Sequence, residues 1–79
     1  MLLETPILDA TGLACPLPLL KTKLALKPLS SGETLHVLAT DAGAERDIPA
    51  FVNLSPHVLV RSTVEEGIYH FWITKGESA

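Results

Sequence analysis

The stretch DATGLACPLPLLK, from Asp9 to Lys21, decides how the chain begins to fold. It contains Cys15, the only cysteine of the chain, followed by Pro16 and Pro18. Proline is tolerated in the first turn of a helix, because the backbone N–H groups there have no partner inside the helix. The two prolines therefore predict a helix that begins here, with Cys15 as its N-cap residue and Pro16 as its first helical residue.

The segments on either side of this stretch predict the first three elements. The residues PILDA predict a strand that ends at Asp9, and the apolar pattern from Pro16 to about Leu29 predicts the helix itself. Gly32, just beyond the helix, is a stop signal. The β-branched and apolar residues of 34–40 then predict a buried strand.

A second helix is expected in the middle of the chain. Residues 41–55 indicate a loop that leads into a second, shorter helix. Pro49 fits this helix if it begins near Arg46 or Asp47. A start near Gly43 would place the proline in the interior of the helix, where it causes strain.

The last two segments, 57–66 and 67–75, predict an antiparallel hairpin around a tight turn. The second of them alternates, with Ile68, His70, Trp72 and Thr74 expected on one side and Tyr69, Phe71 and Ile73 on the other. The full order, β-α-β-α-β-β, predicts an α/β (α+β) two-layer sandwich with a four-stranded mixed sheet and two helices on one face. Its first crossover should be parallel and right-handed.

Composition limits the classes of protein and partner. A chain of 79 residues with 47% hydrophobic and 19% charged residues predicts one globular domain, residues 1–79. Its apolar runs are too short to span a bilayer and its beginning does not look like a signal peptide, so we expect no membrane contact. A single cysteine cannot form an internal disulfide or a cysteine cluster for a metal, which fits a reducing compartment. The net charge of −3 argues against direct binding of nucleic acid.

Cys15 has two interpretations. A lone cysteine is most often a small buried side chain. The prolines favour the other interpretation, a thiol displayed where a loop meets a rigid helix. The positive end of the helix dipole would then stabilise the thiolate, and a persulfide anion even more, and would hold the pKa of Cys15 below the usual value of about 8.5. Asp9 could instead raise this pKa if it lay close to the thiol.

The predicted first helix carries two apolar stripes. At about 100° per residue, one stripe consists of Leu19, Thr22, Leu26 and Leu29, and the other of Leu17, Leu20 and Leu24. One interpretation is a single wide surface that faces the core. The other is that the second stripe stays partly exposed as a docking patch, with Lys23 and Lys27 attracting an acidic partner. The lysines would otherwise be ordinary solvated residues.

The sequence shows no clear catalytic partner for the thiol. His36, His57 and His70 fall on strands or strand edges and are expected at the surface or half-buried. Arg46 and Asp47 are expected to cap the second helix or to pair at the surface. A thioredoxin-type mechanism normally requires a second cysteine to resolve a mixed disulfide. Without a catalytic base or a second cysteine, the remaining possibility is that the thiol accepts a group and passes it on, and that other proteins complete the reaction.

A family resemblance rests on the Cys-Pro-x-Pro sequence and its context. The segment LDATGLACPLPLLKTK contains that sequence, with Asp9, Gly12 and Leu13 before it. The similarity extends from Leu8 to Gly76. It also includes Gly32, Glu33, Asp41, Arg46, Asp47, Ile48, Pro49 and Lys75. In this combination the chain resembles the TusA/SirA/YedF-type sulfur carriers, small proteins of bacteria and archaea.

The resemblance implies a cytoplasmic protein with the two-layer fold. We also expect a monomer that binds no cofactor or metal. Cys15 would carry a sulfane sulfur as a persulfide, loaded by a cysteine desulfurase or another sulfur-donor protein and relayed to a sulfur-acceptor protein. In the family such relays serve 2-thiouridine formation in tRNA, molybdenum-cofactor maturation, sulfur oxidation, or redox and selenium-related roles. The protein would act stoichiometrically, as a sulfurtransferase-like carrier within a relay rather than a free-standing enzyme.

Carried over residue by residue, the resemblance makes Cys15 the catalytic residue, while Pro16, Pro18 and Gly12 set the helix start and position the thiolate. Two positions depart from the branch that thiolates tRNA. Leu17 stands where that branch often has an acidic residue, and Ala42 where it often has proline. The docking residues are expected to be Leu17, Leu20, Lys23 and Leu24, with Lys23 at a helix position where that branch carries a basic residue.

Two other functions stay open at this point. In the first, the protein is a regulatory or interaction module whose helix patch binds a regulator or enzyme, and Cys15 transfers nothing. In the second, Cys15 is a single-cysteine redox sensor that forms sulfenic acid or glutathione adducts.

Overall fold

The computed structural model describes residues 5–77, and within them it contains four strands and two helices in the order β-α-β-α-β-β. This is the order that the sequence predicts. The elements are β1 (Ile7–Ala10), α1 (Leu17–Leu26), β2 (Thr34–Ala39), α2 (Ala44–Asn53), β3 (Val58–Glu65) and β4 (Ile68–Thr74).

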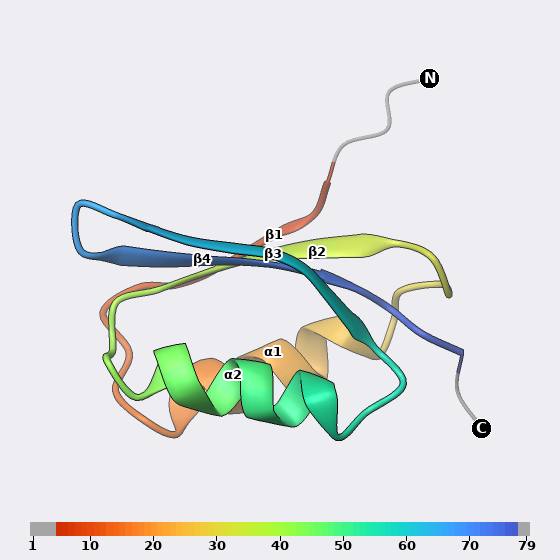
Figure 1. The fold of residues 1–79 in the computed structure, drawn as a ribbon, viewed down its shortest axis with the longest axis horizontal. Helices are drawn as coiled ribbons and strands as arrows, with labels where there is room; N and C mark the ends of the chain where they lie inside the picture. Colours follow the sequence, from red (N-terminus) through yellow and green to blue (C-terminus); the bar gives the residue numbers. More distant parts are fainter. Residues whose placement is uncertain (1–4, 78–79) are drawn as a thin grey trace.

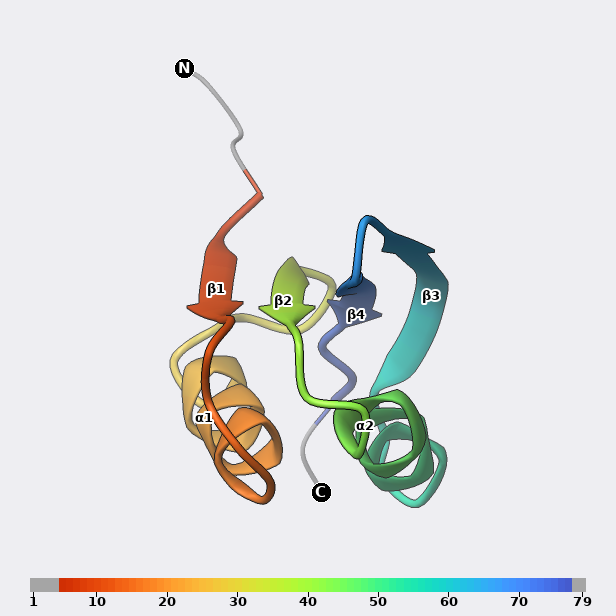
Figure 2. The same ribbon diagram turned by 90° about the vertical axis from the view of Figure 1, so that its left-hand side faces the viewer.

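The strands form one mixed sheet in the order β1-β2-β4-β3. β1 pairs with β2 in parallel, whereas β4 is antiparallel to both of its neighbours. Figure 1 shows both helices on one face of this sheet. In Figure 2, α1 lies against β1 and β2, and α2 against β4 and β3. The predicted two-layer sandwich with a mixed sheet is therefore confirmed.

The hydrophobic core lies between the sheet and the helices. The alternation predicted for β4 is confirmed, because Phe71 and Ile73 are buried on the helix side. His70 and Trp72 lie on the open face, where the ring of His36 stacks on Trp72 with 4.3 Å between the ring centroids. The buried core residues are Leu26, Leu35, Val37, Ala39, Ala44, Ile48, Val52, Phe71 and Ile73.

The first helix is shorter than predicted. α1 ends at Leu26, three residues before Leu29. Pro28 has no backbone N–H to continue the ladder of hydrogen bonds, and the chain closes with a turn in which the N–H of Leu29 donates to the carbonyl of Leu26. Of the two stripes on this helix, the one containing Thr22 faces the core. The Thr22 hydroxyl is satisfied there because it donates to the carbonyl of Pro18 at 2.8 Å.

The second helix begins earlier than predicted and is not shorter than the first, since each has 10 residues. It starts at Ala44, so Pro49 lies inside it. The start is set by Asp41, whose backbone carbonyl accepts from Ala44 N–H and whose carboxylate accepts from Gly43 N–H at 2.9 Å. Proline leaves the carbonyl four residues earlier without its helical partner. That carbonyl belongs to Glu45, an exposed residue, so water can hydrate it.

Replacing Ile48 by Ala should lower the free energy of unfolding by about 2–5 kcal/mol, because Ile48 is fully buried under the sheet. Urea unfolding followed by circular dichroism measures the change. Leu54→Ala is the control, because Leu54 is 91% exposed and should cost less than about 0.5 kcal/mol. Equal losses in the two variants would contradict this placement of the core.

Candidate functional site

Cys15 lies at the end of the sheet where both helices begin. Because β1 and β2 are parallel, their carboxyl ends meet at one edge, and the segments after them lead into α1 and α2. Figure 1 shows the two helices starting at this same end of the molecule. Cys15 is an exposed free thiol, so the alternative that it is a buried packing residue is wrong.

The loop between β1 and Cys15 is held by short hydrogen bonds. The Asp9 carboxylate accepts from the backbone N–H of Thr11 at 3.0 Å and from its hydroxyl at 2.6 Å. Gly12 has a φ of +80°, which favours glycine, and its N–H donates to the Thr40 hydroxyl at 2.9 Å. Gly12 therefore turns the chain and fastens this loop to the end of β2.

The helix begins one residue later than predicted. Pro16, not Cys15, is the N-cap residue, Leu17 is the first helical residue and Pro18 the second. The carbonyl of Pro16 accepts the first helical hydrogen bond, from Leu20, while the N–H of Leu17 donates to Ala14 in the preceding turn. The thiol thus stands just outside the helix.

The hydrogen-bond partner of the thiol is a carboxylate rather than a helix amide. The Sγ of Cys15 donates to Oδ2 of Asp47 at 3.4 Å. The other oxygen of this carboxylate, Oδ1, lies 3.5 Å from Nε of Arg46. Asp47 was expected to cap α2 or to pair at the surface. It does pair with Arg46, but it also reaches from the first turn of α2 to the sulfur.

This contact reverses the expected direction of the pKa shift. The hydrogen bond to Asp47 raises the pKa of Cys15 above its usual value, and desolvation and the negative charges of Asp47 and Asp41 act in the same direction. The Arg46 guanidinium opposes them. The prediction of a lowered pKa was wrong because it considered α1 alone. Asp9 is not the cause, since its carboxylate bonds Thr11, which lowers its own pKa.

The surroundings of the sulfur are too tight for a ligand. A shallow recess beside Cys15 is lined mainly by the two helix starts and encloses essentially no free volume (about 0 Å³). Gly43 borders the same place. A Cβ on Gly43 would lie 2.8 Å from Oδ2 of Asp41 and 3.7 Å from Sγ of Cys15. Gly43 is therefore required because a side chain would collide with Asp41, and not because of its backbone angles. Since the recess has no free volume, a group that reacts with the sulfur must approach the sulfur from solvent.

The second stripe of α1 is exposed. Leu17, Leu20 and Leu24 are 43%, 46% and 61% exposed, which rules out a single wide face toward the core. Lys23 lies on the exposed surface of the same helix, with Nζ 5.3 Å from the centre of the Phe51 ring. The four predicted docking residues thus lie on the accessible surface of the helix that follows Cys15.

The other candidate residues lie elsewhere. His36 and His70 are on the open face of the sheet and His57 is near the end of α2, all half-buried and none lining the recess at the thiol. Residues 5–77 contain no group of three or more His, Cys, Asp or Glu placed to hold a metal ion. No helix in this range is long and apolar enough to cross a membrane.

Sequence reasoning missed Asp47, Asp41 and Gly43 as neighbours of the thiol. They follow β2 and lie far from Cys15 in the chain, since Asp47 comes 32 positions after Cys15. A signal was present, because the carboxyl ends of two parallel strands share one edge of a sheet. The predicted parallel crossover therefore placed the segment after residue 40 beside the segment after residue 10.

Comparison with known proteins shows the family of the chain. Residues 7–75 match the family model described as sulfurtransferase TusA. The chain belongs to the TusA family. YrkI of Bacillus subtilis is 49% identical over 70 residues, 89% of this chain and 93% of that protein. The sulfur carrier protein TusA of Allochromatium vinosum is 48% identical over 68 residues, 86% of this chain and 90% of that protein.

A fold similar to that of this TusA-family protein is found in a solved structure. The crystal structure of a SirA-like protein from Desulfitobacterium hafniense superimposes with a TM-score of 0.77. The match covers 90% of this chain and 97% of that one, at 23% sequence identity. At this level of identity the likeness concerns the fold alone.

Replacing Asp47 by Asn should lower the pKa of Cys15, because the negative charge that favours the protonated thiol is removed. The rate of alkylation by iodoacetamide against pH measures this pKa. In the unmodified protein the inflection should lie above about 8.5, and in Asp47→Asn it should lie at lower pH.

Glu45→Gln is the matched control, because Glu45 is an exposed acidic residue of the same helix that does not line the recess. It should leave the inflection where it is. An inflection at or below about 8.5 in the unmodified protein, or no change in Asp47→Asn, would contradict the role of this carboxylate.

Proposed function

We propose that this protein is a sulfur carrier that holds sulfane sulfur as a persulfide on Cys15. A cysteine desulfurase or another sulfur-donor protein loads it, and an acceptor protein takes the sulfur in the cytoplasm. The observation that carries the proposal is an exposed, single thiol beside a recess without room for a ligand. A small substrate has no place to bind there, so sulfur must arrive on a group that a partner extends to Cys15.

The transfer requires only sulfur exchange. The Cys15 thiolate attacks the terminal sulfur of the donor persulfide. A sulfur–sulfur bond forms at Cys15, the sulfur–sulfur bond of the donor breaks, and the donor leaves as a thiolate. The donor thiolate can take up the proton that Cys15 loses. One sulfur–sulfur bond replaces another, so no external oxidant or reductant is needed. In delivery, a thiolate of the acceptor attacks the terminal sulfur of the Cys15 persulfide, and Cys15 leaves as a thiolate.

Asp47 has a restraining role in this scheme. Thiolate is the reactive form of cysteine, and the Asp47 carboxylate disfavours this form in the free protein by raising the pKa of Cys15. An exposed cysteine with this property resists oxidation and alkylation until a partner binds. The raised pKa argues against the redox-sensor alternative, because sensor cysteines have low pKa values.

The exposed stripe of α1 is the surface we assign to partner docking. Leu17, Leu20 and Leu24 follow Cys15 along one side of the helix, and Lys23 adds a positive charge. Apolar side chains that remain exposed on a monomer often mark a protein contact. A partner seated on this stripe would lie next to the sulfur.

Leu17 and Ala42 are positioned to influence which acceptor is used. Both are exposed, Leu17 in the first turn of α1 and Ala42 between Asp41 and Gly43 at the recess. They therefore face a partner that reaches Cys15. Leu17 has no charge, whereas an acidic residue at this position would attract a basic patch on an acceptor. Acceptors in tRNA thiolation, molybdenum-cofactor maturation or related sulfur trafficking should therefore differ in their affinity for this protein.

Incubation with a cysteine desulfurase and cysteine should increase the intact mass of the protein by one sulfur atom. Dithiothreitol should reverse the gain, because it reduces a persulfide. Mass spectrometry of the intact protein measures both. Cys15→Ser should gain nothing, and loading of this variant, or no loading of the unmodified protein by several desulfurases and sulfane donors, would contradict the proposal.

Leu20→Gln and Leu24→Gln should each slow loading by roughly fivefold, because an apolar side chain at the centre of an interface that is replaced by a polar one costs about 1 kcal/mol. Loading rates at limiting desulfurase measure the effect. The rate of Cys15 alkylation by iodoacetamide should not change, since the thiol itself is untouched.

Val64→Gln is the matched control, because Val64 is 57% exposed but lies on β3. It should load like the unmodified protein. If all three variants load equally fast, the docking surface lies elsewhere while the carrier role of Cys15 can still hold.

A further inference from the structure

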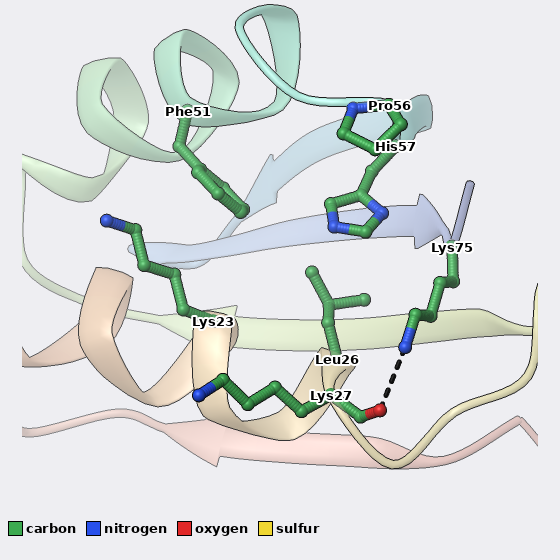
Figure 3. A pocket seen from close by; sticks show the side chains of 7 residues that line it. All are labelled: Lys23, Leu26, Lys27, Phe51, Pro56, His57 and Lys75. Carbon is green, nitrogen blue, oxygen red and sulfur yellow. Dashed lines mark hydrogen bonds between the residues drawn. The ribbon is translucent and has the colours of Figure 1, made fainter. Parts of the chain in front are cut away.

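A second feature of the molecule is a pocket between the carboxyl-terminal parts of the two helices, distant in the fold from the helix starts at Cys15. Its volume is about 490 Å³, within the range of small-molecule sites. Figure 3 shows the residues that surround it. They include Lys23 and Leu26 of α1, Lys27 at its end, Phe51 of α2, His57, and Lys75 after β4.

The charge of this pocket is opposite to that of the whole chain. The chain has a net charge of −3 and only six lysine and arginine residues. Three of them, Lys23, Lys27 and Lys75, line the pocket, whereas none of the described residues that line it is acidic. Three like charges around one cavity repel one another, and an anion between them would relieve that repulsion.

Two of the polar groups are held in place. The Lys75 ammonium donates to the backbone carbonyl of Lys27 at 2.8 Å, which leaves its other hydrogens for a ligand. Nδ1 of His57 accepts from the N–H of Gly76 at 3.0 Å. In the neutral ring the hydrogen is then on Nε2, which makes His57 a further donor. Figure 3 shows this ring between Phe51 and Lys75.

The same pocket offers apolar surface. Leu26 belongs to the buried core, and the half-buried ring of Phe51 packs against that core. The rings of Phe51 and His57 lie 5.9 Å apart at an angle of 52°. The Lys23 ammonium stands over the Phe51 ring. A ligand that carries only charge would leave this surface unused, so a flat apolar body joined to an anionic group is the better match.

We propose that this pocket binds a small phosphate monoester carried on a flat ring, the chemistry of a nucleoside monophosphate. Lys27, Lys75 and His57 would hold the phosphate, and Phe51 would contact the ring above the buried Leu26 at the base of the pocket. Lysine is a common phosphate ligand because its ammonium group offers three donors. The site is separate from Cys15 and needs no step of the proposed sulfur transfer.

Titration of the full-length, ¹⁵N-labelled protein with AMP, followed by NMR, tests this site. AMP should produce saturable shifts at the amides of Phe51, His57 and Lys75. Adenosine, which lacks the phosphate, and inorganic phosphate, which lacks the ring, should each bind at least about fivefold more weakly. Cys15→Ser should bind AMP like the unmodified protein, so the result does not depend on whether sulfur is carried.

Lys27→Gln and Lys75→Gln should each weaken AMP binding by roughly fivefold. Lys21→Gln is the matched control, because Lys21 is an exposed lysine of α1 outside the pocket. Lys75 also bonds the end of α1, so a thermal melt of each variant distinguishes lost binding from lost folding. Lys27 contributes only its backbone carbonyl to that bond, and its substitution should leave the melt unchanged.

Three results would overturn the proposal. The first is the absence of saturable shifts with AMP. The second is an equal loss of binding in Lys21→Gln, which would indicate general attraction of an anion to lysines. The third is binding of a short acidic, aromatic peptide at these same amides without binding of AMP, which would make the pocket a protein contact instead.

Discussion

The parallel pairing of β1 with β2 is the constraint on which the rest of the structure depends. It brings Ala10 opposite Ala39, so the chain leaves both strands at the same edge of the sheet. Each strand is followed by a helix that returns across the same face, and both helices therefore begin together. The N–H of Gly12 then bonds the Thr40 hydroxyl, which joins the two exits directly. Without this pairing, Cys15 and Asp47 would have no reason to meet.

The proximity of the two helix starts explains why the thiol is restrained. A helix N-terminus attracts negative charge, and α2 meets this preference with Glu45 and Asp47 in its first turn. Asp41 forms the turn just before it. Two of these residues, Asp47 and Asp41, place their carboxylates near the sulfur, and their effect on its pKa outweighs the effect expected from the first helix. The acidic residues that stabilise the start of α2 are thus the same residues that raise the pKa of Cys15.

The seam between the helices has different chemistry at its two ends. Acidic residues lie beside Cys15 at one end, and lysines surround the larger pocket at the other. The lysines near the end of α1 also suit its dipole, and Lys75 bonds one of its last carbonyls. The same dipole preferences that stabilise each helix therefore contribute to a thiol held protonated and to a separate cationic pocket.

Most of the fold could be predicted because its signals are local. Alternation in 68–74 assigned Phe71 and Ile73 to the core, and the prolines after Cys15 located the start of α1 to within one residue. Helix boundaries were less predictable. Pro49 suggested a later start for α2, but the turn at Asp41 determines the start and the exposed side of the helix tolerates the proline.

The sequence by itself determined the order of the elements, the display of Cys15 on a loop before a helix, and the two stripes of α1. These features depend on residues within a few turns of one another. Only the tertiary structure decided which stripe is buried and which group bonds the sulfur. Both depend on what packs beside α1, and its neighbours come from strands and a helix that lie far along the chain. A preference within one helix predicted a lowered pKa, whereas a carboxylate from the next helix raises it.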